Sequence, residues 1–297
     1  MTAAQRGFLL LSSHLGDPQR RCLTGPQLRE LARRVQSADL QPDSREMELA
    51  DLIQLGYGAQ QGAQILTLLR QEAALNAYLR RAEKLGLGVL SRGTEAYPQR
   101  LRRSLGLDAP GCLWYKGDLS LLDGPRISLV GSRDLNPENE AFARQAGLQA
   151  AAQGFTLVSG NARGADQTAQ EACLEAGGRV ISIVADDLPS HRSRENVLYL
   201  CEDSFDFPFS GPRALSRNRV IHALSPAVLV TQSSLETGGT WDGTTRNLRK
   251  GWSRVFCFDD GHLSTDQLCQ LGAAPIQTAH LADLTLLCQP EWNLFSL

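Results

Sequence analysis

The sequence has no excess of positive charge. Its 30 Lys and Arg residues are matched by 32 Asp and Glu residues, which gives a formal net charge of −2 at pH 7. No bulk positive field therefore draws the protein to nucleic acid, and any contact with DNA has to rest on a local patch. Lysine is scarce and occurs at Lys84, Lys116 and Lys250, so the basic residues are almost all arginine.

Paired cysteines and clustered histidines are also missing. The 7 cysteines include no C-x-x-C pair, and the 5 histidines show no metal-binding spacing. We therefore expect no disulfide framework, no metal and no cofactor, but buried reduced thiols in a cytoplasmic protein. The apolar patch at 8–11 is too short for a signal peptide or a membrane span, so no membrane association is expected.

Two common catalytic signatures are absent. No G-x-S-x-G segment occurs, so the nucleophilic serine of a hydrolase elbow is not expected. No G-x-x-x-x-G-K-[ST] loop occurs either, so ATP hydrolysis is not expected. The sequence favours a binding protein over an enzyme.

A strand–turn–helix pattern is present between residues 125 and 166. An apolar run at 127–130 ends at Gly131, an amphipathic segment follows, and a second apolar run at 155–158 ends before Gly160. This order is typical of a doubly wound sheet, in which ligands bind where the parallel strands end. We predict an α/β fold with a mostly parallel, Rossmann-like sheet and a binding site at these turns.

The chemistry of the two turns suits an anionic ligand. Gly131, Gly160 and Gly164 have no Cβ, so a phosphate can approach the backbone N–H groups. Arg133 and Arg163 add cations whose planar forks suit phosphate oxygens. The alternative is that the glycines only shape tight turns. Two turns of similar composition favour phosphate binding.

Hydrophobic periodicity divides the chain into a helical part over 1–108, a sheet-containing part over 109–290 and a tail over 291–297.

Within the sheet-containing part, turn signals and apolar runs assign the remaining segments. We predict an edge strand at 112–115, a short helix at 195–201 and a strand at 227–230. A turn at 237–240 is expected to close that last strand, and a helix to follow at 244–250.

The order of these segments resembles the DNA-processing protein A (DprA/Smf) family. The resemblance is carried by Ala96-Tyr97-Pro98-Gln99-Arg100-Leu101, the stretch 110–130, Gly131-Ser132-Arg133, Ser159 to Asp166 (SGNARGAD, like SGLARGID), Ser216 to Ile221 with Leu224-Ser225 (like RNRIIAGLS), Thr237 to Thr240, and Leu271-Gly272-Ala273. It implies an extended Rossmann-like domain after a helical domain similar to SAM or helix-hairpin-helix modules. It also implies single-stranded DNA binding, delivery of a RecA-type recombinase and a homodimer, with a role in DNA uptake and recombination.

The resemblance and the turn chemistry together give a set of candidate DNA- and phosphate-binding residues. These are Gly131, Ser132, Arg133, Ser159, Gly160, Arg163, Gly164, Arg217, Asn218, Arg219, Gly238, Gly239 and Thr240, with Lys116, Asp166 and Trp241 as further candidates. Arg217 and Arg219 flank Asn218, so one of them can form a structural ion pair instead. Asp166 is interpreted as a helix cap that orients its turn.

Aromatic residues accompany the arginines. Phe205, Phe207 and Phe209 precede the Arg217 segment, and Trp241 lies in the fourth turn. Aromatics beside cations suit stacked bases and their phosphates. The alternative is that the phenylalanines belong to the core.

A second hypothesis remains open, in which the same turns bind a nucleotide-derived small molecule as a sensor or enzyme, for instance in antiviral defence. Related nucleotide-cleaving Rossmann proteins carry a PGGxGTxxE signature with a catalytic glutamate. The corresponding stretch here, TGGTWDGTTRN, has Arg246 and Asn247 at the positions of that glutamate, and Asp242 is a candidate to replace its carboxylate.

Overall fold

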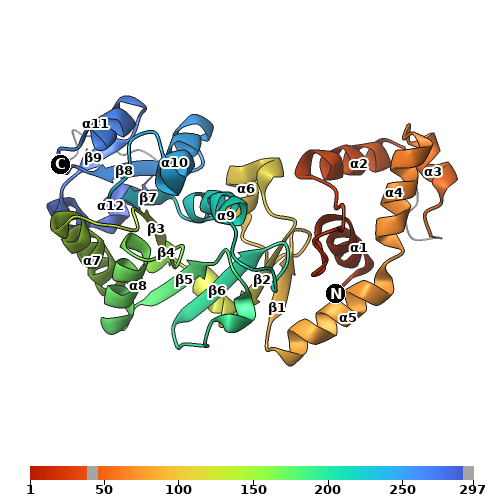
Figure 1. Cartoon of the computed structure of the whole chain (residues 1–297), viewed down its shortest axis with the longest axis horizontal. Helices are drawn as coiled ribbons and strands as arrows, with labels where there is room; N and C mark the ends of the chain where they lie inside the picture. The colour runs from red at the N-terminus through yellow and green to blue at the C-terminus, as the bar shows by residue number, and fades with distance from the viewer. Residues whose placement is uncertain (39–45, 290–297) are drawn as a thin grey trace.

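A mixed sheet runs through the centre of the molecule in the computed structural model, which describes residues 1–38 and 46–289 (Figure 1). The sheet of the described residues has nine strands in the order β1-β2-β6-β5-β4-β3-β7-β8-β9. The strands are β1 (Gly88–Ser91), β2 (Cys112–Lys116), β3 (Arg126–Val130), β4 (Thr156–Ser159), β5 (Arg179–Ile183), β6 (Val197–Glu202), β7 (Ala227–Val230), β8 (Arg254–Phe258) and β9 (Ala274–Ile276). All neighbours from β6 to β9 in that order are parallel, while β1 and β2 pair antiparallel at one edge. The predicted α/β, mostly parallel doubly wound sheet is confirmed.

Helices lie ahead of the sheet and on both of its faces. The N-terminal ones gather beside β1 at one end of the molecule (Figure 1) and are α1 (Ala3–Ser12), α2 (Gly25–Ser37), α3 (Leu49–Gln54), α4 (Ala59–Leu69) and α5 (Glu72–Lys84). The others are α6 (Gln99–Leu105), α7 (Pro137–Ala152), α8 (Ala165–Glu175), α9 (Gly211–Leu224), α10 (Gly238–Lys250), α11 (Leu263–Gln270) and α12 (Leu284–Cys288). None of these helices is long and apolar enough to cross a membrane.

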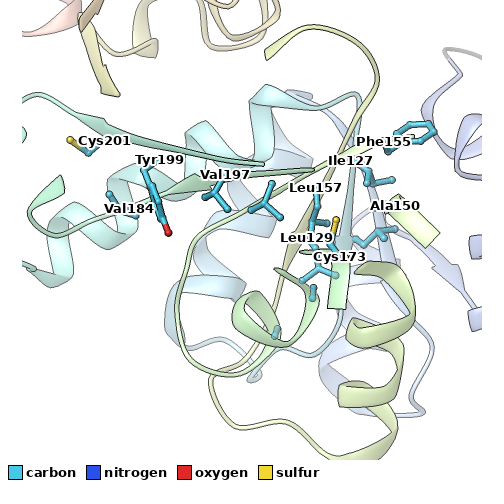
Figure 2. Close-up of a cluster of buried hydrophobic side chains, with 14 of the residues drawn as sticks. Ile127, Leu129, Ala150, Phe155, Leu157, Cys173, Val184, Val197, Tyr199 and Cys201 are labelled. Carbon is cyan, nitrogen blue, oxygen red and sulfur yellow. The ribbon is translucent and has the colours of Figure 1, made fainter. Parts of the chain in front are cut away.

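Side chains that alternate in direction along the strands form two separate hydrophobic cores, one on each face of the sheet. In β3, Ile127 and Leu129 point to the face covered by α7 and α8, where Cys173 is buried with them (Figure 2). Phe142 of α7 belongs to the same buried cluster. Val130 points to the other face, which is covered by α6 and α9. Successive strand residues face opposite sides, so a continuous apolar run fits a strand that is buried on both faces.

The N-terminal helices pack against the antiparallel edge through an aromatic cluster. Tyr78 of α5 stacks on Phe205 with ring centroids 4.3 Å apart and meets the edge of Trp114. Nearby, His14 and Asp203 form an ion pair of 2.6 Å, and the hydrogen bond to that carboxylate raises the pKa of His14 to about 10. These contacts join α1 and α5 to the sheet.

The division of the chain at residue 108 stays a prediction. β1 and α6 precede that position, yet β1 pairs with β2 and α6 packs against α9. The expected tail at 291–297 lies outside the described residues.

Tyr78 provides a test of this junction. Its hydroxyl donates to Asp206 Oδ1 over 2.7 Å and accepts from the Phe205 N–H over 3.0 Å. We expect Tyr78→Phe to lower the free energy of unfolding by about 1–3 kcal/mol, because both partners lose their hydrogen bond. Tyr57→Phe is the matched control, since the buried Tyr57 hydroxyl has no partner among the described residues. Equal loss in both variants, measured by urea denaturation, would contradict this account.

Three local predictions are wrong. The helix expected at 195–201 is absent: Val197–Glu202 form β6, because this run pairs on both sides, with β5 and with β2. The strand at 112–115 is internal, since β1 covers its outer side. Residues 237–240 do not form a separate turn: Thr237 is the N-cap of α10, which begins at Gly238 rather than at Thr244.

Candidate functional site

A cleft of about 440 Å³ opens at the carboxyl ends of β3 and β7. From β3 the chain continues to β4, β5 and β6 on one side of β3, and it later returns to β7 on the opposite side. The direction of strand order therefore reverses between β3 and β7. Ligands of open α/β sheets bind at such a switch point. The cleft is lined by residues 130–133 at the end of β3, by Ala162 and Asp166 after β4, by Phe209 and one side of α9, and by Ser234 and residues 237–240 around the start of α10.

A second compartment of about 300 Å³ adjoins the cleft. The two share Arg133, Phe209 and Arg217, and the second also includes Arg163 and Asp186. Three of the predicted arginines therefore come together at this edge of the sheet.

Arg217 lies on the floor of the cleft and is buried. Its Nη2 is 3.8 Å from Asp166 Oδ2, and the two side chains are only 10% and 7% exposed. Burial raises the pKa of Asp166, although Arg217 and the Ala162 N–H oppose it, and burial lowers the pKa of Arg217. Asp166 accepts from the Ala162 N–H over 3.2 Å and so orients the turn. The expectation that it caps the helix is wrong, because the N-cap of α8 is Gly164 and Asp166 lies within the first helical turn. The pair leaves the floor with little net charge.

Close packing explains two of the glycines. A Cβ on Gly160 would stand 1.2 Å from Arg217 Nη1, so only glycine leaves room for the buried guanidinium. Gly164 has a φ of +82°, and a Cβ there would stand 2.4 Å from the Arg133 carbonyl oxygen. Both glycines are needed by the turns themselves, whether or not a ligand is bound.

The rim of the cleft carries exposed cations and an exposed aromatic ring. Phe209 is 55% exposed, and the Arg133 guanidinium lies 5.9 Å from its ring centroid. Arg163 pairs with Asp134 over 2.6 Å, but both side chains are largely exposed, at 72% and 86%. Such a surface pair is weak, so the Arg163 guanidinium can exchange its partner for a phosphate.

The N-terminus of α10 points at the same cleft. Gly238, Gly239 and Thr240 line it, the first turn has no acidic residue, and Thr237 makes no side-chain cap. The N–H groups of an uncapped first turn and the helix dipole favour a negatively charged or acceptor group. Thr240 Oγ1 donates to the Gly131 carbonyl, and Asn218 Nδ2 donates to the Gly239 carbonyl, each over 2.9 Å. These two bonds fix α10 to β3 and α9.

Other predicted site residues lie outside the cleft. Arg219 forms an ion pair with Glu202 over 2.5 Å, so both Arg217 and Arg219 have a carboxylate partner, and of the two only Arg217 lines the cleft. Lys116 Nζ donates to the His191 carbonyl over 2.6 Å, Ser159 is fully buried at the end of β4, and Trp241 packs on the core. Their roles in binding stay predictions.

The three phenylalanines have different environments. Phe205 is fully buried, as the core interpretation expects, and Phe207 lies beside the Arg213 guanidinium at 5.4 Å. Phe209 alone of the three lines the cleft. Asp242, the substitute carboxylate of the enzyme hypothesis, lies 3.6 Å from Arg246 and outside the cleft lining.

Sequence reasoning missed His222, which also lines the cleft. The signal available was its position one helical turn after Asn218, on the same side of α9. Among the described residues, no group of three or more His, Cys, Asp or Glu side chains is arranged to hold a metal ion.

Comparison with known proteins gives consistent matches. The family model for DNA recombination-mediator protein A matches residues 88–278. DNA processing protein DprA of Streptococcus pneumoniae is 30% identical over 141 residues, which are 44% of this chain and 50% of that protein. The chain thus spans about half the length of the curated relatives it matches.

Two solved structures share the fold. The X-ray structure of DNA processing protein A from Streptococcus pneumoniae superposes with a TM-score of 0.72 at 23% identity, covering 95% of this chain and 96% of that one. The structure of DNA processing protein A from Helicobacter pylori, described for its single-stranded DNA binding mode, gives 0.56 at 23% identity and covers 67% and 95%.

Proposed function

Because this chain belongs to the DNA recombination-mediator protein A family, we propose that it binds single-stranded DNA in the cleft between α9 and α10. One observation carries the proposal: Phe209 stands exposed at the mouth of the cleft with Arg133 beside its ring. An aromatic face and a cation at one point suit a stacked base and its phosphate, with no need for sequence readout. The Helicobacter pylori relative of the same fold is described as binding single-stranded DNA.

The candidate residues take different parts in this proposal. Arg133 and Arg163 contact phosphates at the rim, where the chain of phosphates can continue past the cleft. The first turn of α10, from Gly238, offers N–H donors. Arg217 and Asp166 support the floor rather than contact the backbone, because their charges already face each other.

Family resemblance extends the proposal to partners. We propose that the protein delivers a RecA-type recombinase to the bound strand, as a homodimer in the cytoplasm, during recombination or DNA uptake, and that it acts without catalysis. Light scattering of the protein with and without oligonucleotide, and RecA filament assembly on coated strands, test these points separately.

The arginine contacts are tested by salt dependence. Fluorescence anisotropy with a labelled dT20 strand is measured over a salt series for Arg133→Ala, Arg163→Ala and the double variant. Each lost phosphate contact is expected to reduce the slope of log K against log salt by about 0.7. Arg144→Ala is the matched control, because Arg144 is exposed on α7, lies outside the cleft lining and pairs with Glu175 at the surface.

The competing small-molecule hypothesis gives a different result. Competition with dTMP at equal nucleotide concentration is expected to leave dT20 bound, because a polymer makes several contacts at once. Binding of dTMP as tight as that of dT20, with an unchanged salt slope in both arginine variants, would replace this proposal by a mononucleotide site.

A further inference from the structure

The second compartment beside the cleft contains a carboxylate among its arginines. Asp186, three residues after the end of β5, lines this space of about 300 Å³ together with Phe209 and Arg133. Its side chain is 39% exposed, so a ligand in the compartment can reach the carboxylate. A carboxylate repels phosphate, and its presence in a proposed DNA site therefore needs an explanation.

One oxygen of this carboxylate is held in place and the other is available. His191 Nε2 donates to Asp186 Oδ1 over 2.8 Å, and the His191 side chain is only 13% exposed, so the ring fixes the orientation of the carboxylate. Among the described residues, none donates a side-chain or backbone hydrogen bond to Oδ2 from elsewhere in the chain. Burial acts to raise the pKa of Asp186, but the hydrogen bond from His191 outweighs it and the pKa is lowered. The group is therefore ionised at neutral pH and only accepts hydrogen bonds.

The walls of the compartment suit the flat face of a base. Val184 and Ala185 line it and are only 2% and 6% exposed, and the exposed Phe209 ring lines both the compartment and the cleft. The volume of the compartment is at the lower end of the range for pockets that hold small molecules. Because Phe209 and Asp186 line one space of this size, a base that enters it meets both side chains.

The charges of the site separate phosphate from base. Arg163 is 72% exposed at the rim, and Arg133 lies beside the exposed Phe209 ring, so both guanidinium groups can meet a phosphate on the solvent side. A phosphate placed against Asp186 would instead face a like charge. What suits the Asp186 side of the compartment is an uncharged group that donates hydrogen bonds.

The exocyclic amino group of a nucleobase is such a donor. Cytosine carries an N4 amino group and adenine an N6 amino group, whereas thymine and uracil have a carbonyl oxygen at the corresponding position. A carboxylate accepts from the amino group but repels the carbonyl oxygen, because both of these oxygens are acceptors.

We infer that Asp186 is a specificity-determining residue whose Oδ2 accepts a hydrogen bond from the amino group of a base stacked on Phe209. The inference rests on the proposed function, because it assigns the base-recognising group of the same DNA site. It predicts that cytosine binds better than uracil, which has a carbonyl oxygen in place of the amino group.

Two strands with the same backbone test this prediction. Fluorescence anisotropy at pH 7 compares dC20 and dU20 on the parent protein and on Asp186→Leu, which removes both acceptor oxygens. The parent protein should bind dC20 about 3- to 10-fold more tightly than dU20, as expected for one hydrogen bond to a half-exposed group. Asp186→Leu should weaken dC20 binding and strengthen dU20 binding, because leucine neither accepts from the amino group nor repels the carbonyl oxygen. Loss by the same factor on both strands would show that Asp186 only supports the fold and would overturn the inference.

Two further variants separate the hydrogen bond from general charge. Asp186→Asn keeps one acceptor oxygen and should retain part of the preference for dC20. Asp134→Leu is the matched control, because the Asp134 carboxylate is 86% exposed and lines neither the cleft nor the compartment. It should strengthen both strands by the same factor. If it changes the dC20/dU20 ratio as much as Asp186→Leu does, charge and not a bond to the base sets the preference, and the inference is wrong.

A modified strand tells attraction to the amino group from repulsion of the uracil oxygen. A 20-mer of 2-pyrimidinone deoxynucleotides lacks the amino group and has no oxygen in its place. It should bind the parent protein more weakly than dC20, and binding as tight as that of dC20 would contradict the hydrogen bond. Equal binding of dC20 and dU20 to the parent protein would overturn the inference and leave the proposed function in place. Absence of binding to either strand would instead refute the proposed function.

Discussion

Replacing Arg217 with Leu is expected to lower the free energy of unfolding by about 3–5 kcal/mol, the cost of leaving a buried charge without its partner. The Asp166 carboxylate is 7% exposed, and its nearest cation is the Arg217 guanidinium at 3.8 Å. Leucine fills part of the space but supplies no charge. Urea denaturation at pH 7 measures the loss.

A double-mutant cycle separates charge from packing. Asp166→Asn removes the carboxylate charge but keeps the size of the side chain, and Arg217→Leu with Asp166→Asn leaves no unpaired charge. The double variant is expected to be more stable than Arg217→Leu alone, with a coupling energy of up to about 3 kcal/mol. If the double variant is as unstable as Arg217→Leu, the loss comes from the cavity at Gly160 and not from the charge.

The loss should also depend on pH. Burial already raises the pKa of Asp166 above the ordinary value of 3.8, and removal of Arg217 raises it further. Between the ordinary pKa of an unfolded Asp and the raised pKa of Asp166 in the folded variant, the folded state binds more protons than the unfolded state. The stability of the variant therefore falls as pH rises through that window. The free energy of unfolding of Arg217→Leu should therefore be closer to that of the parent protein at pH 4 than at pH 7. A constant difference between the two proteins would show that Asp166 does not titrate in that range.

The parts of the fold that local signals define were predicted, and the parts that depend on a distant partner were not. The turns after β3 and β4 follow from apolar runs that end at Gly131 and Gly160. The helix expected at 195–201 is wrong because pairing with β2 and β5, which local signals do not report, makes the run from Val197 a strand. β9 is three residues long, too short for any periodicity to be seen.

In the site too, local signals identify some residues, while the roles of others depend on distant partners. Arg217 and Arg219 are two positions apart on α9, which turns them about 200° from each other. One therefore faces the cleft and the other meets Glu202, and the order of residues alone cannot say which. His222 is not among the expected site residues because its side chain contacts Asn247 on a different helix, which the order of residues does not show.

Loss of the Phe209 ring should have the largest effect on binding of any single change at the rim. Stacking of a base on an aromatic side chain contributes about 1–3 kcal/mol, so Phe209→Ala is expected to weaken dT20 binding about 5- to 150-fold. Phe209→Trp keeps an aromatic face and should bind as the parent protein does or better. Because Phe209 is 55% exposed, its truncation should leave the unfolding free energy within about 0.5 kcal/mol, which thermal melting checks.

Comparison of Phe209→Ala with Arg133→Ala separates the contribution of base stacking from that of charge. The guanidinium lies 5.9 Å from the ring centroid, so Arg133→Ala removes a phosphate contact and also a neighbour that holds the ring. Phe209→Ala should lower affinity by a similar factor at every salt concentration, because stacking releases no counterions, whereas Arg133→Ala should change the slope. If Phe209→Ala changes the slope and not the affinity at high salt, the ring only positions Arg133. In that case the bases do not stack at the mouth of the cleft.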